Sequence, residues 1–287
     1  MRVPFLLLTP CCVLVGVATA VQQSGKVHPV HAVLVLIGAL AAHTSVNAFN
    51  EHFDFLSGLD VRTIRTPFSG GSGTLSGHPQ SAKMVLATAA AAVFITAAIG
   101  VFFLIVRGPK ILFVGIPGIL TVLLYTPRAV KHPFPCLIAP GFGFGICMVN
   151  GTHFALTGSY SWASFASSLV PFFLVSDLLL LNQIPDVEAD LSVGRRNYPI
   201  VAGRKTSSRI YTVFLILTYA TILLGAVFGI FPKTSILGFL TVPLAILTIQ
   251  GVIRNRENIP ALIPFMGMNV ALNLATPVLF ALGIWMG

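Results

Sequence analysis

The stretch MVLATAAAAVFITAAIGVFFLIV, which runs from Met84 to Val106, contains no charged residue and is long enough to cross a lipid bilayer as a helix. Similar apolar stretches recur along the 287 residues, of which 55% are hydrophobic and only 9% are charged. This composition excludes an ordinary soluble globular protein. We predict an all-α, multi-pass transmembrane helix bundle that forms a single domain over residues 1–287. About nine helices are expected, near residues 4–22, 29–49, 84–106, 110–126, 134–155, 162–182, 210–230, 234–252 and 263–285.

The Lys and Arg residues are distributed unevenly between the two sides of the predicted bundle, and cytoplasmic loops usually carry the excess. If the N-terminus is cytoplasmic, the cytoplasmic side holds Arg2, Arg62, Arg65, Lys83, Arg128, Lys131, Arg195, Arg196, Arg204, Lys205, Arg209, Arg254 and Arg256. The opposite side holds Lys26, Arg107, Lys110 and Lys233. The net charge of +9 could reflect only this topology and anionic lipid. We expect an integral protein of a bacterial or archaeal cytoplasmic membrane, with no nucleic-acid partner.

The first apolar stretch also resembles a signal peptide, because it ends in the small residues Ala18-Thr19-Ala20. It is long enough to span a membrane, and the distribution of basic residues is consistent with its retention. We therefore expect it to form the first transmembrane helix.

Acidic residues are rare in this chain and are concentrated in two short segments. Six of the eight lie in NEHFDFLSGLD (residues 50–60) and NQIPDVEAD (residues 182–190). Each segment has an Asn four residues before an Asp and a second Asp shortly afterwards. Carboxylates at the end of a membrane helix are costly and usually mark a functional site. Two such clusters are suited to holding divalent metal ions against a diphosphate.

The first cluster is predicted to follow one face of a helix. Asn47, Asn50 and Asp54 have the spacing i, i+3, i+7, which places them on one side. Gly58 is expected to end the helix, so that Asp60 can turn back toward the same pocket.

The second cluster has the spacing i, i+4, i+8, so Asn182, Asp186 and Asp190 would share a face if the helix continues through them. Pro185 predicts either a kink or the start of a new turn at this point. Four predicted helices separate the two clusters, which places both on the basic side. Basic residues follow each cluster, so simple pairing of helix-end acids with local Arg residues is an alternative to a metal site.

These features resemble those of the UbiA superfamily of intramembrane aromatic prenyltransferases, which carry two Asp-rich motifs at the cytoplasmic ends of helices in a nine-helix bundle. The resemblance covers essentially the whole chain. The segment of residues 50–60, with Gly58 two residues before its last Asp and with Glu51 after its Asn, resembles the form found in 1,4-dihydroxy-2-naphthoate prenyltransferases. Tyr125 and the basic residue after it, either Arg128 or Lys131, resemble a Tyr-plus-basic motif of the family.

The resemblance implies a site and a reaction. Asp54 and Asp60 would coordinate one Mg²⁺ ion, and Asp186 and Asp190 another, with the diphosphate of a polyprenyl donor between them. Further contacts to the diphosphate are implied for Asn50, Asn182, Arg62, Arg65, Lys131, Arg128, Tyr125 and Arg195. Asp60 would also help to deprotonate an aromatic acceptor. The prenyl tail would leave sideways into the lipid bilayer.

Two further features have alternative interpretations. The Gly- and Ser-rich segment of residues 66–77 lacks the Gly-Lys-Ser/Thr ending of a P-loop, and it is either a flexible connection or a mobile cap over the site. Asn47 and Asp177 are candidates to line the cavity for the acceptor, although Asp177 could instead form a structural hydrogen bond to a neighbouring helix.

The alternatives from other functional classes are an ion-coupled transporter and a membrane scaffold. Transporters place their coupling sites near the middle of the bilayer, whereas these acids gather at one face. A scaffold gives no reason for two matched clusters. Within the prenyltransferase interpretation, a hydroxybenzoate, homogentisate or glycerol-phosphate lipid acceptor stays an alternative to dihydroxynaphthoate. The sequence does not indicate whether the protein has protein partners.

Overall fold

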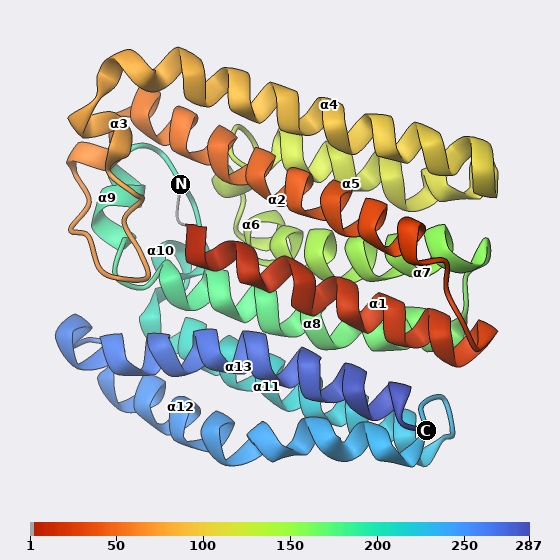
Figure 1. Cartoon of the computed structure of the whole chain (residues 1–287). Coiled ribbons are helices and arrows are strands. Elements are labelled where there is room, and N and C mark those ends of the chain that lie inside the picture. The colour runs from red at the N-terminus through yellow and green to blue at the C-terminus, as the bar shows by residue number, and fades with distance from the viewer. Residues whose placement is uncertain (1–2) are drawn as a thin grey trace.

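The chain is described from Val3 to Gly287 in a computed structural model, and helices account for its regular structure with no strand in that range (Figure 1). Eight helical segments are long and apolar enough to cross a membrane: Phe5–Ser24, Pro29–Ser57, Pro79–Arg107, Pro133–Thr157, Trp162–Asn182, Gly203–Val227, Lys233–Asn255 and Ile259–Trp285. The helix predicted at 110–126 corresponds to a shorter apolar segment, Pro109–Leu124. The predicted bundle of about nine helices is therefore confirmed. Arg2, one of the basic residues assigned to the cytoplasmic side, lies outside the described residues.

The long helices are α1 (Leu8–Ser24), α2 (Pro29–Ser57), α4 (Ala82–Arg107), α5 (Leu112–Leu124), α8 (Trp162–Asn182), α11 (Gly203–Val227), α12 (Val242–Asn255) and α13 (Ile259–Trp285). One span is composite, with α6 (Pro133–Gly141), a π-helix (Phe142–Val149) and α7 (Asn150–Thr157) in succession. Three short helices, α3 (Thr74–Gly77), α9 (Val187–Ser192) and α10 (Tyr198–Val201), lie together at one end of the bundle (Figure 1).

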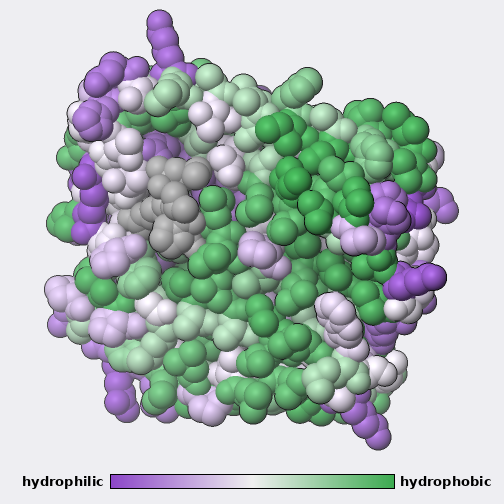
Figure 2. All heavy atoms as spheres, in the orientation of Figure 1, coloured by the Kyte–Doolittle hydropathy of each residue, from purple (hydrophilic) through white to green (hydrophobic). Residues whose placement is uncertain are grey.

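The outer surface of the bundle matches the bilayer. Large apolar side chains such as Phe94, Ile105 and Phe113 are more than 70% exposed, which a soluble protein would rarely tolerate in such number. Figure 2 shows an apolar band across the middle of the molecule, with hydrophilic residues gathered toward the two ends. The protein is therefore an integral, multi-pass membrane protein.

Helix α8 lies at the centre of the packing. In its most apolar window 67% of the residues are buried, compared with 17% for the span that contains α4. Its Leu174 packs in the main core with Leu215 of α11 and Leu272 of α13, and all three are fully buried. The core is thus concentrated around α8, α11 and α13, while α4 and α5 lie at the periphery.

Two glycines bring the composite span against the backbone of α8. A Cβ atom added at Gly141 would lie 2.1 Å from the carbonyl oxygen of Phe172, and one added at Gly145 would lie 2.6 Å from the amide nitrogen of the same residue. No larger side chain fits at either position unless the helices move apart. This contact fixes the position of α8 relative to α6.

The two acidic clusters end their helices differently. Gly58 ends α2 in the left-handed conformation, with φ of 71°, and its amide donates to the carbonyl of Asp54, as predicted. By contrast, α8 ends at Asn182 and α9 begins only at Val187. The helix therefore does not continue through Asn182, Asp186 and Asp190, and the break predicted at Pro185, which lacks an amide proton, is confirmed.

Candidate active site

The two acidic clusters meet at the end of the bundle that carries α3 and α9 (Figure 1). The guanidinium group of Arg195 forms ion pairs with Asp54 of the first cluster and with Asp190 of the second, the latter at 3.1 Å. The side-chain amide of Asn197 donates to the other carboxylate oxygen of Asp190 at 2.8 Å. Helices far apart in the sequence therefore form one site, as the predicted topology required.

The Gly- and Ser-rich segment lies across both clusters. The amide of Gly70 donates to Asp186 at 3.1 Å, and the hydroxyl of Ser72 donates to Glu51. Gly70 and Gly71 have φ of 81° and 68°, which only glycine adopts readily. A Cβ atom on Gly71 would lie 2.6 Å from a carboxylate oxygen of Asp60. These contacts favour the cap interpretation over a flexible connection.

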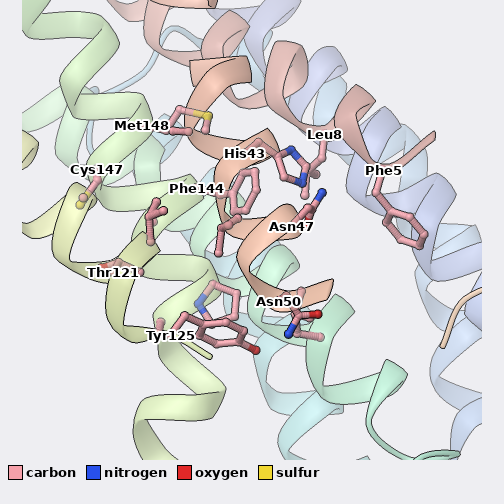
Figure 3. Close-up of a pocket in the computed structure, with 18 of the residues that line it drawn as sticks. Phe5, Leu8, His43, Asn47, Asn50, Thr121, Tyr125, Phe144, Cys147 and Met148 are labelled. Atoms are coloured by element: carbon pink, nitrogen blue, oxygen red, sulfur yellow. The ribbon is translucent and has the colours of Figure 1, made fainter. Parts of the chain in front are cut away.

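A cavity of about 460 Å³ extends from the acidic clusters into the membrane interior (Figure 3). Its polar mouth is lined by the four Asp residues of the two clusters. Farther in, the wall is apolar and includes Val114, Phe144 and Met148. The arrangement suits a molecule with an anionic head and a long apolar tail.

Nine of the predicted site residues line this cavity: Asn47, Asn50, Asp54, Asp60, Tyr125, Asn182, Asp186, Asp190 and Arg195. Arg62, Arg65, Arg128 and Lys131 do not line it, and all four are exposed. Arg62 instead donates to the backbone and side-chain oxygens of Ser192, at 3.1 and 3.2 Å, and so ties the loops after the two clusters together. Neither candidate for the basic residue that follows Tyr125 reaches the cavity, because both lie on the outer surface of the turn after α5.

Asp177 also does not line the cavity, so of its two interpretations the one that places it at the acceptor cavity is wrong. Its neighbours Leu178 and Leu179 line the cavity, and Asp177 itself is fully buried on another side of α8. It lies near Tyr211 of α11, whose hydroxyl donates to Asn269 of α13 at 3.0 Å. Asp177 therefore belongs to the interface between α8 and α11.

Burial shapes the electrostatics of the cluster residues that lie outside the spans. Burial and, to a smaller extent, the nearby charge of Asp190 raise the pKa of Asp186 to about 7. The pKa of Asp60 is raised by burial and by Glu51, and that of Asp190 is raised by burial despite Arg195. Burial opposes the charge on Arg195, yet Asp54 and Asp190 raise its pKa above the usual value. The buried carboxylates therefore favour a cationic partner.

The site offers unused oxygen atoms of the kind that hard cations bind. Asp60, Asn182 and Asp186 each have a buried side-chain oxygen with no hydrogen-bond partner within residues 3–287. In the same range no three His, Cys, Asp or Glu side chains already form a metal site, and Arg195 lies between Asp54 and Asp190. Carboxylate and amide oxygens are the ligands that Mg²⁺ prefers, so the residues present fit this ion.

Residues 9–285 match the sequence pattern of the UbiA prenyltransferase family. The chain belongs to this family. This UbiA-family protein is therefore a prenyltransferase enzyme, and the resemblance inferred from its motifs is confirmed.

Three relatives illustrate how far the similarity extends. The chain is 27% identical over 228 residues to the 1,4-dihydroxy-2-naphthoate octaprenyltransferase of Bacillus subtilis (strain 168), covering 77% of this chain and 70% of that protein. A UbiA homolog from Aeropyrum pernix K1 superimposes with a TM-score of 0.70 at 18% identity, over 99% of this chain and 98% of that one. A homolog from Archaeoglobus fulgidus, solved bound to DMAPP and Mg²⁺, superimposes with a TM-score of 0.66 at 16% identity, over 96% and 98% of the two chains.

Two polar residues of the cavity, Asn197 and His43, are among those not predicted from the sequence. Asn197 precedes Tyr198-Pro199 and accepts from the amide of Ile200, which is a recognisable helix-capping pattern, but the contact with Asp190 depends on the tertiary fold. His43 lies four residues before Asn47 on the same face of α2. Extending the spacing of the first cluster by one turn would have found it.

Proposed function

We propose that this prenyltransferase moves a polyprenyl group from its diphosphate to an aromatic quinone precursor of the dihydroxynaphthoate type, with release of diphosphate. The observation that carries the proposal is the meeting of both acidic clusters at the mouth of an apolar cavity. The similarity to the naphthoate octaprenyltransferase supports this choice of acceptor. An ion-coupled transporter is disfavoured, because the acids gather at one end of the bundle.

The proposed metal ligands are Asp54, Asp60, Asp186 and Asp190, and bound Mg²⁺ would supply Lewis-acid stabilisation of the negative charge on the leaving diphosphate. The side chains of Asn50, Asn182, Tyr125 and Arg195 line the same mouth and would hydrogen-bond the diphosphate oxygens. The homolog solved with DMAPP and Mg²⁺ supports this assignment.

Other residues around the cavity would stabilise the reacting prenyl group, exclude water and accept the proton. Aromatic side chains such as Phe144 and Tyr125 line it and can stabilise positive charge that develops on the prenyl group. The loop that contains Gly70 and Gly71 would exclude water from the reacting atoms. Asp60 has a buried oxygen without a partner among the described residues and would accept the proton released by the acceptor.

We also propose that residues 1–287 act as a single domain with the site facing the cytoplasm. The distribution of Lys and Arg supports this orientation. In a background without the four native Cys residues, Ser57→Cys and Ser192→Cys should both be labelled from the cytoplasmic side only. Labelling from opposite sides would contradict a shared site.

The function is tested with purified protein, Mg²⁺, prenyl diphosphates of several lengths and a panel of acceptors. The panel contains dihydroxynaphthoate, hydroxybenzoate, homogentisate and a glycerol-phosphate lipid, and products are identified by mass. We expect prenylated dihydroxynaphthoate as the main product, lost on chelation and restored by Mg²⁺. A product from another acceptor alone would change the proposed substrate, and full activity in excess chelator would contradict the metal site.

A further inference from the structure

A stripe of polar side chains continues from the acidic mouth into the cavity along α2. His43, Asn47, Asn50 and Asp54 follow the spacing of one helix face, and all four line the cavity. At 1.5 Å per residue, Asn47 lies about 10 Å deeper along α2 than Asp54, and His43 lies about 16 Å deeper. Figure 3 shows His43, Asn47 and Asn50 in succession along this helix. The stripe therefore extends well beyond the reach of a diphosphate held at the mouth.

The surroundings of the two deep residues are apolar. Leu8, Phe144 and Met148 line the cavity near them (Figure 3). The ring of His43 packs edge-on against Phe144, with 4.6 Å between the ring centroids. Polar side chains at this depth of a membrane protein are costly and are retained where they have a partner.

Each deep residue has an unused hydrogen-bonding group. In the part of the chain that the structure describes, the side-chain amide of Asn47 forms no hydrogen bond, and His43 is bonded only through Nδ1, to the hydroxyl of Thr9 at 2.8 Å. Thr9 has no other acceptor within that part of the chain, so its hydroxyl proton is assigned to this hydrogen bond. The proton of the neutral imidazole is then on Nε2, where it provides a donor at the cavity wall.

A prenyl tail cannot use these groups, because it has no hydrogen-bonding atom. If a tail covered them, each would lose water without gaining a partner, at a cost of about 1–3 kcal/mol. The tail has an apolar alternative on the opposite wall, where Ile99, Phe103 and Val114 line the cavity from α4 and α5.

We propose that His43 and Asn47 bind the aromatic acceptor through an oxygen substituent at the end of its ring system remote from the diphosphate. The Nε2–H group of His43 donates to this oxygen, and the amide of Asn47 completes the contact. The inference deepens the proposed function by specifying the acceptor class, which is a hydroquinone-type ring with oxygen atoms on opposite sides. An acceptor without an oxygen substituent at the remote end of its ring would leave the two deep residues without a partner.

The test compares two acceptors that differ only in the remote oxygen, 1,4-dihydroxy-2-naphthoate and 1-hydroxy-2-naphthoate. The ratio of their kcat/KM values is measured for the wild type and for His43→Phe, which keeps the ring and removes the donor. The intrinsic reactivity of the two rings affects both enzymes equally, so the change in this ratio reports the hydrogen bond. We expect the ratio to fall about tenfold in the variant, with an unchanged KM for the prenyl diphosphate.

Two further variants make the result decisive. Asn47→Leu removes the amide without touching the contact between His43 and Thr9, and it should lower the same ratio even if His43→Phe does not fold. Phe103→Leu alters the opposite, apolar wall and should leave the ratio unchanged. An unchanged ratio in a folded His43→Phe or Asn47→Leu variant would overturn the proposal. An equal rise in KM for the acceptor and for the prenyl diphosphate would also overturn it. Failure of the wild type to prenylate either acceptor would instead contradict the proposed function.

Discussion

The first acidic cluster is carried by the uninterrupted helix α2, whereas the second straddles the break between α8 and α9. On α2, the helix itself sets the direction of Asn50 and Asp54. In the second cluster, Asp186 is held by the amide of Gly70, and Asp190 by the guanidinium of Arg195 and the side chain of Asn197, which follow α9 closely in the sequence. The comparison teaches that one half of the site is positioned mainly by a continuous helix and the other mainly by hydrogen bonds from the loops around it, while Arg195 pairs with both.

The largest expected effect tests whether the two halves are equally necessary. Asp54→Asn and Asp190→Asn should each lower kcat/KM by about 10²–10³ or more, because each removes a negative charge from the groups proposed to hold the metal and diphosphate. Glu257→Gln is a matched control, since Glu257 is exposed and forms its ion pairs with Arg204 and Arg256, which do not line the cavity. A near-normal rate in either Asp variant would show that its cluster is dispensable.

An intermediate effect tests the dependence of the second cluster on its partners. Asn197→Ala removes the hydrogen bond to Asp190 and should weaken apparent Mg²⁺ affinity or activity by about 10–100-fold. In the first cluster, Thr126→Val removes the partner of Asn50, but that contact is long at 3.4 Å, and the effect should stay within about twofold. Mg²⁺ titrations of both variants measure the difference. Equal sensitivity would abolish the distinction between the clusters.

The smallest effect concerns the turns that follow each cluster. Gly58 and Gly194 have φ of 71° and 78°, and a Cβ atom would meet nothing within 4 Å at either position. Alanine at each should therefore cost only the backbone strain, about 1 kcal/mol, and lower the melting temperature slightly. Gly77→Ala is the control, because Gly77 is helical and equally open. Unchanged melting of both test variants would show that the turns tolerate a side chain.

The sequence predicts the membrane fold well because the bilayer acts on the chain locally. Each apolar stretch must satisfy its own backbone hydrogen bonds, so its length and composition identify a helix. The span predicted at 162–182 matches α8 at both ends. The span predicted at 29–49 is too short, because α2 continues through the acidic cluster to Ser57. The apolar sequence ends where the charged residues begin, whereas the helix continues past them.

The site is predictable to the extent that helix periodicity controls it. The spacing of Asn47, Asn50 and Asp54 places them on the cavity wall as predicted. Basic residues are less predictable, because long side chains in loops can point to either side. Arg195 turns inward while Arg128 and Lys131 remain exposed, and no spacing distinguishes them. Asp177 was misplaced because a single helix position changes the wall that a side chain faces.

The close packing of Gly141 and Gly145 against α8 suggests which wall of the cavity can change to accept substrates of different size. Gly141 and Gly145 press one side of the cavity against the backbone of α8, so that side cannot yield without displacing Asn182 and the second cluster. Helix α5, in contrast, has no buried residue among those described, and its outward side chains meet lipid. Substitutions on α5 are therefore expected to enlarge or shorten the cavity while the acidic end stays in place. A preference for a different isoprenoid length is thus expected to arise from substitutions on the cavity-lining side of α5, which includes Val114 and Ile119.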